Sequence, residues 1–374
     1  MRVAVVHEWL ASHAGSEKVV EQILQIYPDA DLFSLVDFLS PDQRYFIGNR
    51  SVQTSFIQRL PWAKRIFRQY LPLMPLAVEQ FDLSAYDVVI SSNHAVAKGV
   101  LTAPHQLHIS YVHTPIRYAW DLQHQYLRQA GLERGIKGGI TRLILHYLRL
   151  WDTASAHRVD KFVANSQFIA KRIWRAYRRP AQVIYPPVDM SRFDWQQPRE
   201  EFYLTVSRFV PYKRVDLTVQ AFNQLGLPLV VIGDGSDWRR IKAMAGPTIR
   251  LLGQQPDAVV TDHMQRCKGF IFPAEEDFGI TPVEAQAAGA PVIAFGRGGV
   301  AETVIHGKTG VLFSEQTVDS LVQAIKSFEM GMYELNRDTL RQQAEQFSIH
   351  CFQNQLRNCI EQTYTAFLQG DPLE

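Results

Sequence analysis

The chain has 374 residues, of which 46% are hydrophobic and 20% are charged, and its formal net charge at pH 7 is +2. This composition is typical of a folded globular protein and excludes a disordered chain. No apolar run reaches the roughly 18 residues that a membrane-spanning helix needs. The short apolar run Val3–Val6 is typical of a first strand and not of a signal peptide, so we expect a cytoplasmic protein.

The small net charge hides a basic region. From Arg50 to Arg179 the chain has 19 Lys and Arg against 7 Asp and Glu, a net charge of +12, which leaves −10 for the remainder. Aromatic residues interleave with these charges, as in amphipathic helices that lie on anionic membranes. Nucleic acid and a simple solvated helix face are the alternatives. We expect peripheral contact between this basic region and the inner face of the cytoplasmic membrane, and no nucleic acid.

The first half of the chain alternates strands with helices. We predict strands at Val3–Val6, Asp31–Val36, Val88–Ser91 and Leu107–Val112, and helices at Ser16–Ile26, Trp62–Leu71 and Ala95–Gly99. A further strand ends at the pair Pro186–Pro187, where the chain cannot continue in a sheet. This pair marks the predicted domain junction, so residues 1–187 form the first, acceptor-side domain.

The second half repeats this alternation. We predict strands at Phe202–Ser207, Pro228–Ile232, Ile249–Leu252 and Gly269–Phe272, and helices at Val215–Gln224, Ser236–Ala245 and Leu340–Phe367. Residues 188–350 form the second domain, and residues 351–374 are expected to pack back on the first. The predicted fold class is therefore α/β, with two doubly wound, Rossmann-like domains that face a central cleft. Ligands of such sheets bind at the carboxyl ends of the strands.

The segment from Glu276 to Glu284 has two carboxylates separated by seven residues around a Gly-containing turn. A short helix is predicted to begin near Pro282 and to end at Gly289. The backbone N–H groups of residues 278–280 then lie at the positive end of this helix, where a phosphate can bind. A helix N-terminal box that only serves the helix dipole is the alternative.

A second charged loop follows the predicted strand Phe202–Ser207. Arg208 and Lys213 lie five residues apart on this loop. A guanidinium and an ammonium can together hold a diphosphate, the first through paired hydrogen bonds and the second as a point charge. They would then stabilise the charge of the departing diphosphate, and no metal is needed. Surface charges on a loop are the alternative.

Two loops of the first domain also follow strands. Gly15 precedes the first long helix and permits a ligand to approach the backbone, although one glycine is a weak signal. The segment after Leu107–Val112 is rich in groups that recognise sugars: aromatic rings, hydrogen-bond donors and a carboxylate. A capping histidine with core aromatics is the alternative. The candidates for acceptor binding are His113, Arg117, Tyr118, Trp120 and Asp121.

These motifs together resemble the retaining glycosyltransferases of family 4, which have the GT-B architecture. The resemblance spans nearly the whole chain and rests on Glu276 to Glu284, Arg208, Lys213, Gly15, His113 and the turn Gly233-Asp234-Gly235. The sequences of residues 113–121 and 277–282 are similar to those of a bacterial branch of the family that contains O-antigen and exopolysaccharide mannosyltransferases. Ala14 stands where many relatives have a second glycine, which puts the backbone shape of that loop in doubt.

The resemblance implies a role for each residue. Glu284 would hold the ribose hydroxyls, and Glu276 would contact the donor sugar together with the backbone of Phe278, Gly279 and Ile280. Arg208 and Lys213 would bind the donor diphosphate, Gly15 would approach the phosphate or acceptor, and His113 would lie near the sugar. The loop at Gly253 is expected to meet the base, either guanine or uracil. The catalytic candidates are Glu276, Arg208, Lys213 and His113.

The implied reaction is transfer of a hexose with retention, most simply mannose from GDP-mannose, to a lipid-linked saccharide in bacterial surface polysaccharide synthesis. The departing diphosphate helps to deprotonate the acceptor, so we expect no protein nucleophile, no cofactor and no metal site. Three scattered cysteines agree with the last expectation. The alternatives are a UDP-sugar-dependent transferase, a nucleotide-sugar epimerase or hydrolase with His113 as general base, and a non-catalytic nucleotide-sugar-binding protein.

Overall fold

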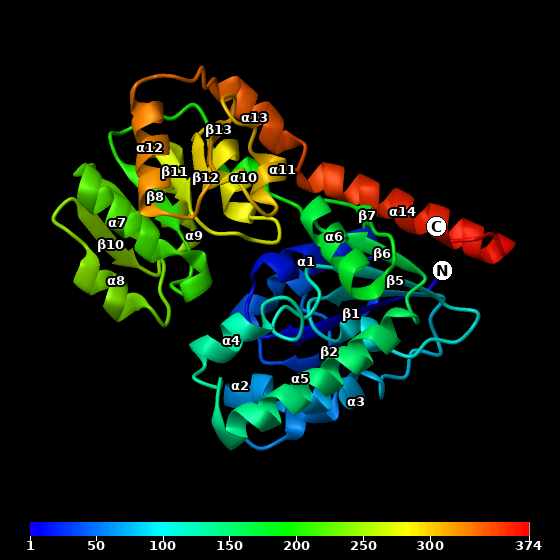
Figure 1. Ribbon diagram of the computed structural model, residues 1–374. Helices are drawn as coiled ribbons and strands as arrows, with labels where there is room; N and C mark the ends of the chain where they lie inside the picture. The colour runs from blue at the N-terminus through cyan, green and yellow to red at the C-terminus, as the bar shows by residue number, and fades with distance from the viewer. Residues whose placement is uncertain (374) are drawn as a thin grey trace. The chain divides into compact units, whose positions relative to one another are not determined.

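The computed structural model describes residues 1–373, which form two compact units (Figure 1). The first unit contains residues 1–185 and 352–373, and the second contains Pro186–Cys351. Each unit is a parallel sheet between layers of helices, which confirms the predicted α/β class of two Rossmann-like domains. The chain passes from one unit to the other at Pro186, inside the predicted junction. The cleft between the domains stays a prediction.

The sheet of the first unit has seven strands in the order β3-β2-β1-β4-β5-β6-β7. The strands are β1 Val3–Leu10, β2 Asp31–Asp37, β3 Val52–Thr54, β4 Val88–Asn93, β5 Leu107–Val112, β6 Lys161–Ala164 and β7 Gln182–Val183. Strand order reverses between β1 and β4, which are paired in parallel. The carboxyl ends of these two strands therefore form the switch point where doubly wound sheets bind ligands.

Helices cover both faces of this sheet (Figure 1). They are α1 Gly15–Ile26, α2 Ala63–Ile66, α3 Met74–Val78, α4 Gln123–Gln129, α5 Gly135–Ala156 and α6 Gln167–Tyr177, with 3-10 segments η1 Pro41–Ile47, η2 Phe56–Arg59, η3 Phe67–Leu73 and η4 Ala97–Gly99. Because side chains alternate along a strand, Val3 and Val5 belong to one core cluster and Ala4 and Val6 to another.

Two predicted helices of this unit are wrong in form. Residues 62–71 form the short α2 followed by η3, because Ile66 leaves the helical conformation and Pro72 lies inside η3. Residues 95–99 contain only η4. None of the helices within residues 1–373 is both long and apolar enough to cross a lipid bilayer.

The sheet of the second unit has six parallel strands in the order β10-β9-β8-β11-β12-β13. The strands are β8 Tyr203–Val206, β9 Leu229–Ile232, β10 Ile249–Gly253, β11 Gly269–Phe272, β12 Val292–Phe295 and β13 Gly310–Phe313. Its helices are η5 Met190–Arg192, η6 Pro211–Lys213, α7 Val215–Leu225, α8 Trp238–Met244, α9 Asp257–Arg266, α10 Ile280–Ala287, α11 Val300–Thr303, α12 Val318–Glu329 and α13 Arg337–Glu345. Here the order reverses between β8 and β11.

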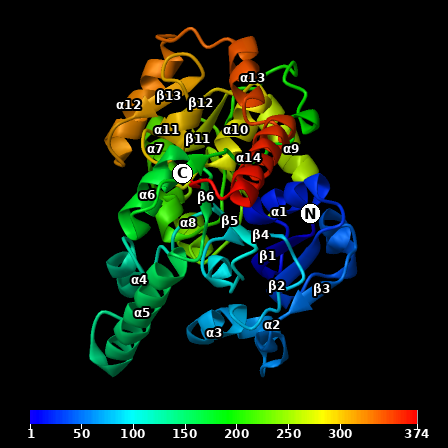
Figure 2. The same ribbon diagram turned by 90° about the vertical axis from the view of Figure 1, so that its right-hand side faces the viewer.

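The predicted single helix Leu340–Phe367 is also wrong. The chain forms α13 and then α14 Ile349–Gln369, with a break at which Phe347 accepts a hydrogen bond from Val188 N at 2.9 Å. The break buries the Phe347 ring against Phe278, with ring centroids 5.6 Å apart. From residue 352 onward α14 belongs to the first unit and lies beside α1 (Figure 2), where Gln353 donates to Gln22 at 2.7 Å.

Candidate active site

The switch point of the second unit brings two predicted loops together. Lys213, at the end of η6 after β8, forms an ion pair with Glu276, which follows β11. Arg208 lies on the same loop as Lys213, and its side chain is exposed. Its guanidinium makes no hydrogen bond or ion pair within residues 1–373. Two cations and a carboxylate from neighbouring strand ends thus lie on one edge of the sheet.

Glycines fix the shape of the Arg208 loop. The turn after β9 packs directly under it, and a Cβ added at Gly233 would lie 1.8 Å from the carbonyl oxygen of Ser207. Phe209 N donates to Asp234 O at 2.8 Å, which ties the two loops together. Gly233 N in turn donates to Gly253 O at 2.8 Å, so the end of β10 joins the same edge. The predicted turn Gly233-Asp234-Gly235 therefore positions the Arg208 loop.

The Glu276 loop is held by a glycine pair that sequence reasoning missed. Gly298 forms an isolated bridge with Glu276, and Gly299 N donates to Glu276 O at 2.9 Å. A Cβ added at Gly299 would lie 2.3 Å from Phe278 Cα. The adjacent glycines after a strand were visible in the sequence as a signal for close backbone approach. The pairing with the Glu276 loop was not, because it depends on β12 lying beside β11.

Helix α10 begins at Ile280 and ends at Ala287, so both predicted ends, near Pro282 and at Gly289, are corrected. Gly279 is the N-cap in a left-handed conformation at φ 84°, which turns the chain into the helix two residues earlier than proline placement suggested. The Phe278 ring is buried, so only its backbone can face a ligand. The segment 278–280 does lie at the positive end of α10, as predicted.

Glu284 lies about one turn inside α10 and is 7% exposed. Arg192, on η5, reaches it with Nη1 3.4 Å from Oε1. Arg192 also approaches Asp257 at 3.5 Å and Thr261 at 3.3 Å. Sequence reasoning missed Arg192, because 92 residues separate it from Glu284. Glu276 and Glu284 therefore have different cationic neighbours, Lys213 and Arg192.

His113 follows β5 in the first unit and belongs to a buried polar cluster. Its Nε2 lies 2.8 Å from Ser92 Oγ, which lies 3.1 Å from His7 Nδ1. Burial lowers the pKa of His113 to about 3, and the nearby His94 and His7 add to this. The ring is therefore neutral at neutral pH. Sequence reasoning missed His7 and Ser92, because nothing in the sequence distinguishes them from other residues of a strand.

Gly15 is the first residue of α1, and its neighbour Glu17 is tied to the helix start and to His7. Glu17 Oε2 accepts from Ala14 N at 3.1 Å, while Oε1 lies 3.7 Å from His7 Nε2. Burial raises the pKa of Glu17, but the hydrogen bond and charge of His7 outweigh it and lower the pKa to about 2. Ala14 is thus accommodated as the N-cap without a second glycine.

The four acceptor-binding candidates other than His113 separate into two groups. Trp120 Nε1 donates to Asp152 at 2.7 Å, and Asp121 forms an ion pair with Arg172. Both side chains are engaged within the unit, which favours the structural alternative for them. Arg117 and Tyr118 follow His113 in the chain and are half-buried, and their acceptor role stays a prediction.

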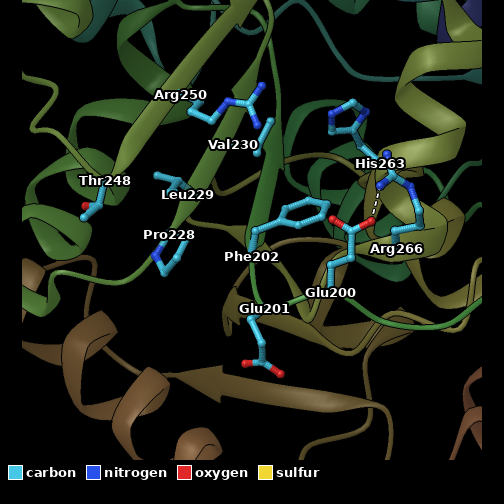
Figure 3. Close-up of a pocket in the computed structure, with 10 residues that line it drawn as sticks. All are labelled: Glu200, Glu201, Phe202, Pro228, Leu229, Val230, Thr248, Arg250, His263 and Arg266. Atoms are coloured by element: carbon cyan, nitrogen blue, oxygen red, sulfur yellow. Dashed lines mark hydrogen bonds and ion pairs between the residues drawn. The ribbon is translucent and has the colours of Figure 1, made fainter.

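A pocket of about 290 Å³ lies elsewhere on the second unit (Figure 3). Figure 3 shows Phe202, Leu229 and Arg250 among its lining residues, and these stand at the starts of β8, β9 and β10. The pocket is therefore at the amino edge of the sheet, opposite Lys213 and Glu276. Within residues 1–373 no group of three His, Cys, Asp or Glu side chains is arranged to hold a metal ion.

Two family models match consecutive parts of the chain. The model described as Glycosyltransferase Family 4 matches residues 30–192, and the model described as Glycosyl transferases group 1 matches residues 189–347. Between them they extend over most of both units.

Curated relatives agree with these families. An uncharacterised glycosyltransferase from Methanocaldococcus jannaschii is 30% identical over 50% of this chain and 54% of its own length. An alpha-1,3/1,6-mannosyltransferase from Schizosaccharomyces pombe is 24% identical over 61% of this chain and 52% of its own. A GDP-mannose-dependent phosphatidylinositol monomannoside mannosyltransferase from Mycobacterium tuberculosis is 30% identical over 32% of this chain and 36% of its own length. The chain spans about half the length of these relatives, or less.

Solved structures share the fold. A lipopolysaccharide outer core galactosyltransferase superposes with a TM-score of 0.67 at 18% identity, over 97% of this chain and 99% of the other. An Anabaena protein solved with UDP-glucose has the same TM-score at 16% identity, over 97% of this chain and 100% of the other. Two Rossmann-like units, motifs at the carboxyl edges of their sheets and both family matches lead to one assignment: the chain belongs to the family 4 glycosyltransferases of GT-B architecture.

Proposed function

We propose that this glycosyltransferase transfers mannose from GDP-mannose, with retention of the anomeric configuration, to a lipid-linked saccharide in bacterial surface polysaccharide synthesis. The observation that carries the donor site is the ion pair between Lys213 and Glu276, with Arg208 on the same loop. The cations supply charge for a diphosphate, and the carboxylate can accept hydrogen bonds from sugar hydroxyls. The choice of mannose is supported by the mannosyltransferases among the relatives.

A donor screen tests this proposal. Purified protein is mixed with GDP-mannose and with a panel of UDP-sugars, with and without a lipid-linked acceptor, and nucleotide release is followed. We expect release with GDP-mannose that depends on acceptor. Release with a UDP-sugar alone would favour the second candidate, a UDP-sugar-dependent transferase, which the Anabaena structure with UDP-glucose supports. Binding without turnover would indicate a non-catalytic protein, and no binding at all would overturn the proposal.

The product distinguishes transfer from the hydrolase and epimerase alternatives. Proton NMR of the product is expected to show an α-glycosidic linkage to the acceptor, the configuration of the donor. Free sugar, or a changed sugar still attached to the nucleotide, would mean that His113 acts as a general base on water or on the sugar.

The two glutamates of the motif are expected to respond differently to substitution. Glu284→Gln should raise the Kd of the donor by about tenfold, because a hydrogen bond to a charged group contributes roughly 1.5–3 kcal/mol. Glu276→Gln should slow transfer by about tenfold or more while changing the Kd less. Calorimetric binding and single-turnover transfer separate these effects. Equal changes in both quantities for both variants would contradict the proposed division between ribose and sugar.

We also propose that the first unit contacts an anionic membrane, and an exposed apolar stripe on α5 supports this. Successive residues on one face of this helix are 84%, 54%, 68%, 46% and 60% exposed: Ile136, Ile140, Leu143, Tyr147 and Leu150. Lys137 is an exposed basic residue next to the stripe, whereas Arg142 and Arg149 lie on the flanks of the helix, where Arg142 donates to Glu133 O and Arg149 donates to Ala119 O. An apolar face with basic neighbours suits the interface of an anionic bilayer.

The stripe predicts a specific loss of membrane binding. Ile140→Glu with Leu143→Glu should abolish co-sedimentation with phosphatidylglycerol vesicles, because two carboxylates would enter the apolar and anionic interface. Met330→Glu with Met332→Glu is the matched control, since both methionines are exposed but lie on the second unit. Binding of the unaltered protein should weaken with salt. If the unaltered protein did not bind the vesicles at low salt, the alternative interpretation of the basic region as a solvated surface would be favoured.

A further inference from the structure

A buried chain of polar side chains runs from α1 to His113 through the ends of β1 and β4. Glu17 Oε1 lies 3.7 Å from His7 Nε2, His7 Nδ1 lies 3.1 Å from Ser92 Oγ, and Ser92 Oγ lies 2.8 Å from His113 Nε2. His7 and Ser92 are 0% exposed, and Glu17 is 3% exposed. Ser92 Oγ is hydrogen-bonded to both rings, so the hydrogen positions of His7, Ser92 and His113 depend on each other. His7 Nε2 has no hydrogen-bond partner among the described residues, so Glu17 acts on His7 through its charge.

The Ser92 hydroxyl links the two histidines. It has one hydrogen, so it can donate to only one of the two rings. When Ser92 accepts from His7 Nδ1–H, it donates to His113 Nε2, and the proton of the neutral His113 ring is on Nδ1. When Ser92 donates to His7, His113 must carry its proton on Nε2. The presence or absence of a proton on His7 Nδ1 therefore determines which nitrogen of the neutral His113 ring carries its proton.

The surroundings of His7 favour its charged form. Glu17 faces it from α1, Glu8 is its neighbour on β1, and the His94 ring lies 5.9 Å away between centroids. Burial raises the pKa of Glu8, but His94 and the backbone N–H groups of residues 94–97, which donate to Oε1 at 2.8 to 3.1 Å, outweigh it and lower the pKa. Its Oε2 lies 2.8 Å from His94 Nδ1. Burial by itself lowers the pKa of His7, but Glu17 and then Glu8 outweigh it and raise the pKa, so the two carboxylates stabilise the imidazolium.

We infer that Glu17, His7 and Ser92 are positioning residues that hold His113 with its proton on Nδ1, so that His113 offers its ligand a hydrogen-bond donor and not a base. This inference rests on the proposed function only in taking a sugar oxygen as that ligand. His113 Nδ1 makes no hydrogen bond within the part of the chain that the structure describes. A hydrogen-bond donor at Nδ1 can stabilise an oxygen of the transferred sugar or of the acceptor substrate. The hydrolase and epimerase alternatives instead need a general base.

Histidine side-chain NMR tests the inference directly. Long-range proton–nitrogen spectra of the ¹⁵N-histidine-labelled full chain, without any sugar nucleotide, distinguish the two tautomers and the imidazolium. At neutral pH we expect His113 as the Nδ1–H tautomer and His7 as the imidazolium, with His113→Gln as the assignment variant. As pH rises through the pKa of His7, the ring should keep the proton on Nε2, which faces the Glu17 carboxylate, and lose the proton on Nδ1. The Ser92 hydrogen should then reverse, and His113 should change to Nε2–H in the same step. A proton on Nε2 at neutral pH, or independent changes at the two rings, would overturn the inference.

Variants of β4 give a matched comparison. Ser92→Ala should shift His113 toward Nε2–H and lower turnover by about tenfold, the effect of one hydrogen bond, with the donor Kd unchanged. Ser92→Thr retains the hydroxyl and should retain the tautomer. Ser91→Ala is the control, because the neighbouring Ser91 bonds His108 Nε2 at 2.9 Å and should leave His113 unaltered. If the His113 signals of Ser92→Ala were identical to those of the unaltered protein, the proposed role of Ser92 in setting the His113 tautomer would be wrong.

The proposed function and the proposed tautomer of His113 are tested independently of each other. If no sugar nucleotide is turned over but His113 has its proton on Nδ1, the proposed function is wrong and the hydrogen-bonded chain stands. If transfer occurs with His113 protonated on Nε2, the proposed positioning by Glu17, His7 and Ser92 is wrong and the proposed function stands. The measurement on the unaltered protein decides the matter even if the Ser92 variants do not fold.

Discussion

Replacement of Lys213 or Arg208 by alanine is expected to lower turnover by roughly 100-fold or more, the usual effect of removing one preorganised electrostatic group. Both cations lie on the loop after β8, at the switch point of the second unit. They are expected to stabilise the charge of the departing diphosphate, which is greater in the transition state than in the bound donor. Steady-state nucleotide release with GDP-mannose measures the effect.

Lys213 needs a further comparison, because its ion pair with Glu276 offers a second explanation. If Lys213 only orients Glu276, then Lys213→Ala in a Glu276→Gln background should cause no additional loss. If it binds diphosphate, most of the loss should persist in that background. Arg250→Ala is the control, since this exposed cation is on the same sheet but at the opposite edge. Unchanged turnover in Lys213→Ala or Arg208→Ala would contradict the diphosphate role.

Replacement of Lys98 by methionine is expected to lower the free energy of unfolding by about 3–5 kcal/mol, because it leaves a buried carboxylate without its charge partner. Lys98 Nζ lies 2.7 Å from Asp152 Oδ1, and both side chains are 0% exposed. Asp152 Oδ2 also accepts from Trp120 and Tyr177, at 2.7 and 2.9 Å. The ion pair therefore connects η4, α5, α6 and the segment after His113.

Thermal unfolding measures this loss. About 2–4 °C per kcal/mol is typical for a unit of this size, so Tm should fall by roughly 6–20 °C. Lys64→Met removes an exposed lysine and should change Tm little. Asp152→Asn added to Lys98→Met removes the remaining charge and should restore part of the stability. A Tm for Lys98→Met equal to that of Lys64→Met would show that the pair contributes nothing.

The sequence alone determined the α/β class, the division near Pro186 and the loops that carry the site. Strands such as Leu107–Val112 and Gly269–Phe272 were predicted with their observed bounds, because a buried parallel strand is a short apolar run. Charged and glycine-containing segments directly after such runs had to lie at the carboxyl edge of a sheet. Arg208, Lys213 and Glu276 could be assigned to one site for that reason.

Only the tertiary structure decided which side chains meet. Arg192 reaches Glu284, Gly299 supports Glu276, and Ser92 joins His7 to His113, and none of these pairs has a recognisable spacing along the chain. They meet because β1 pairs with β4 and β11 with β12, and strand order is set by long-range packing that local residue patterns do not encode. The break between α13 and α14 has the same origin, since burial of Phe347 outweighs a continuous helical pattern.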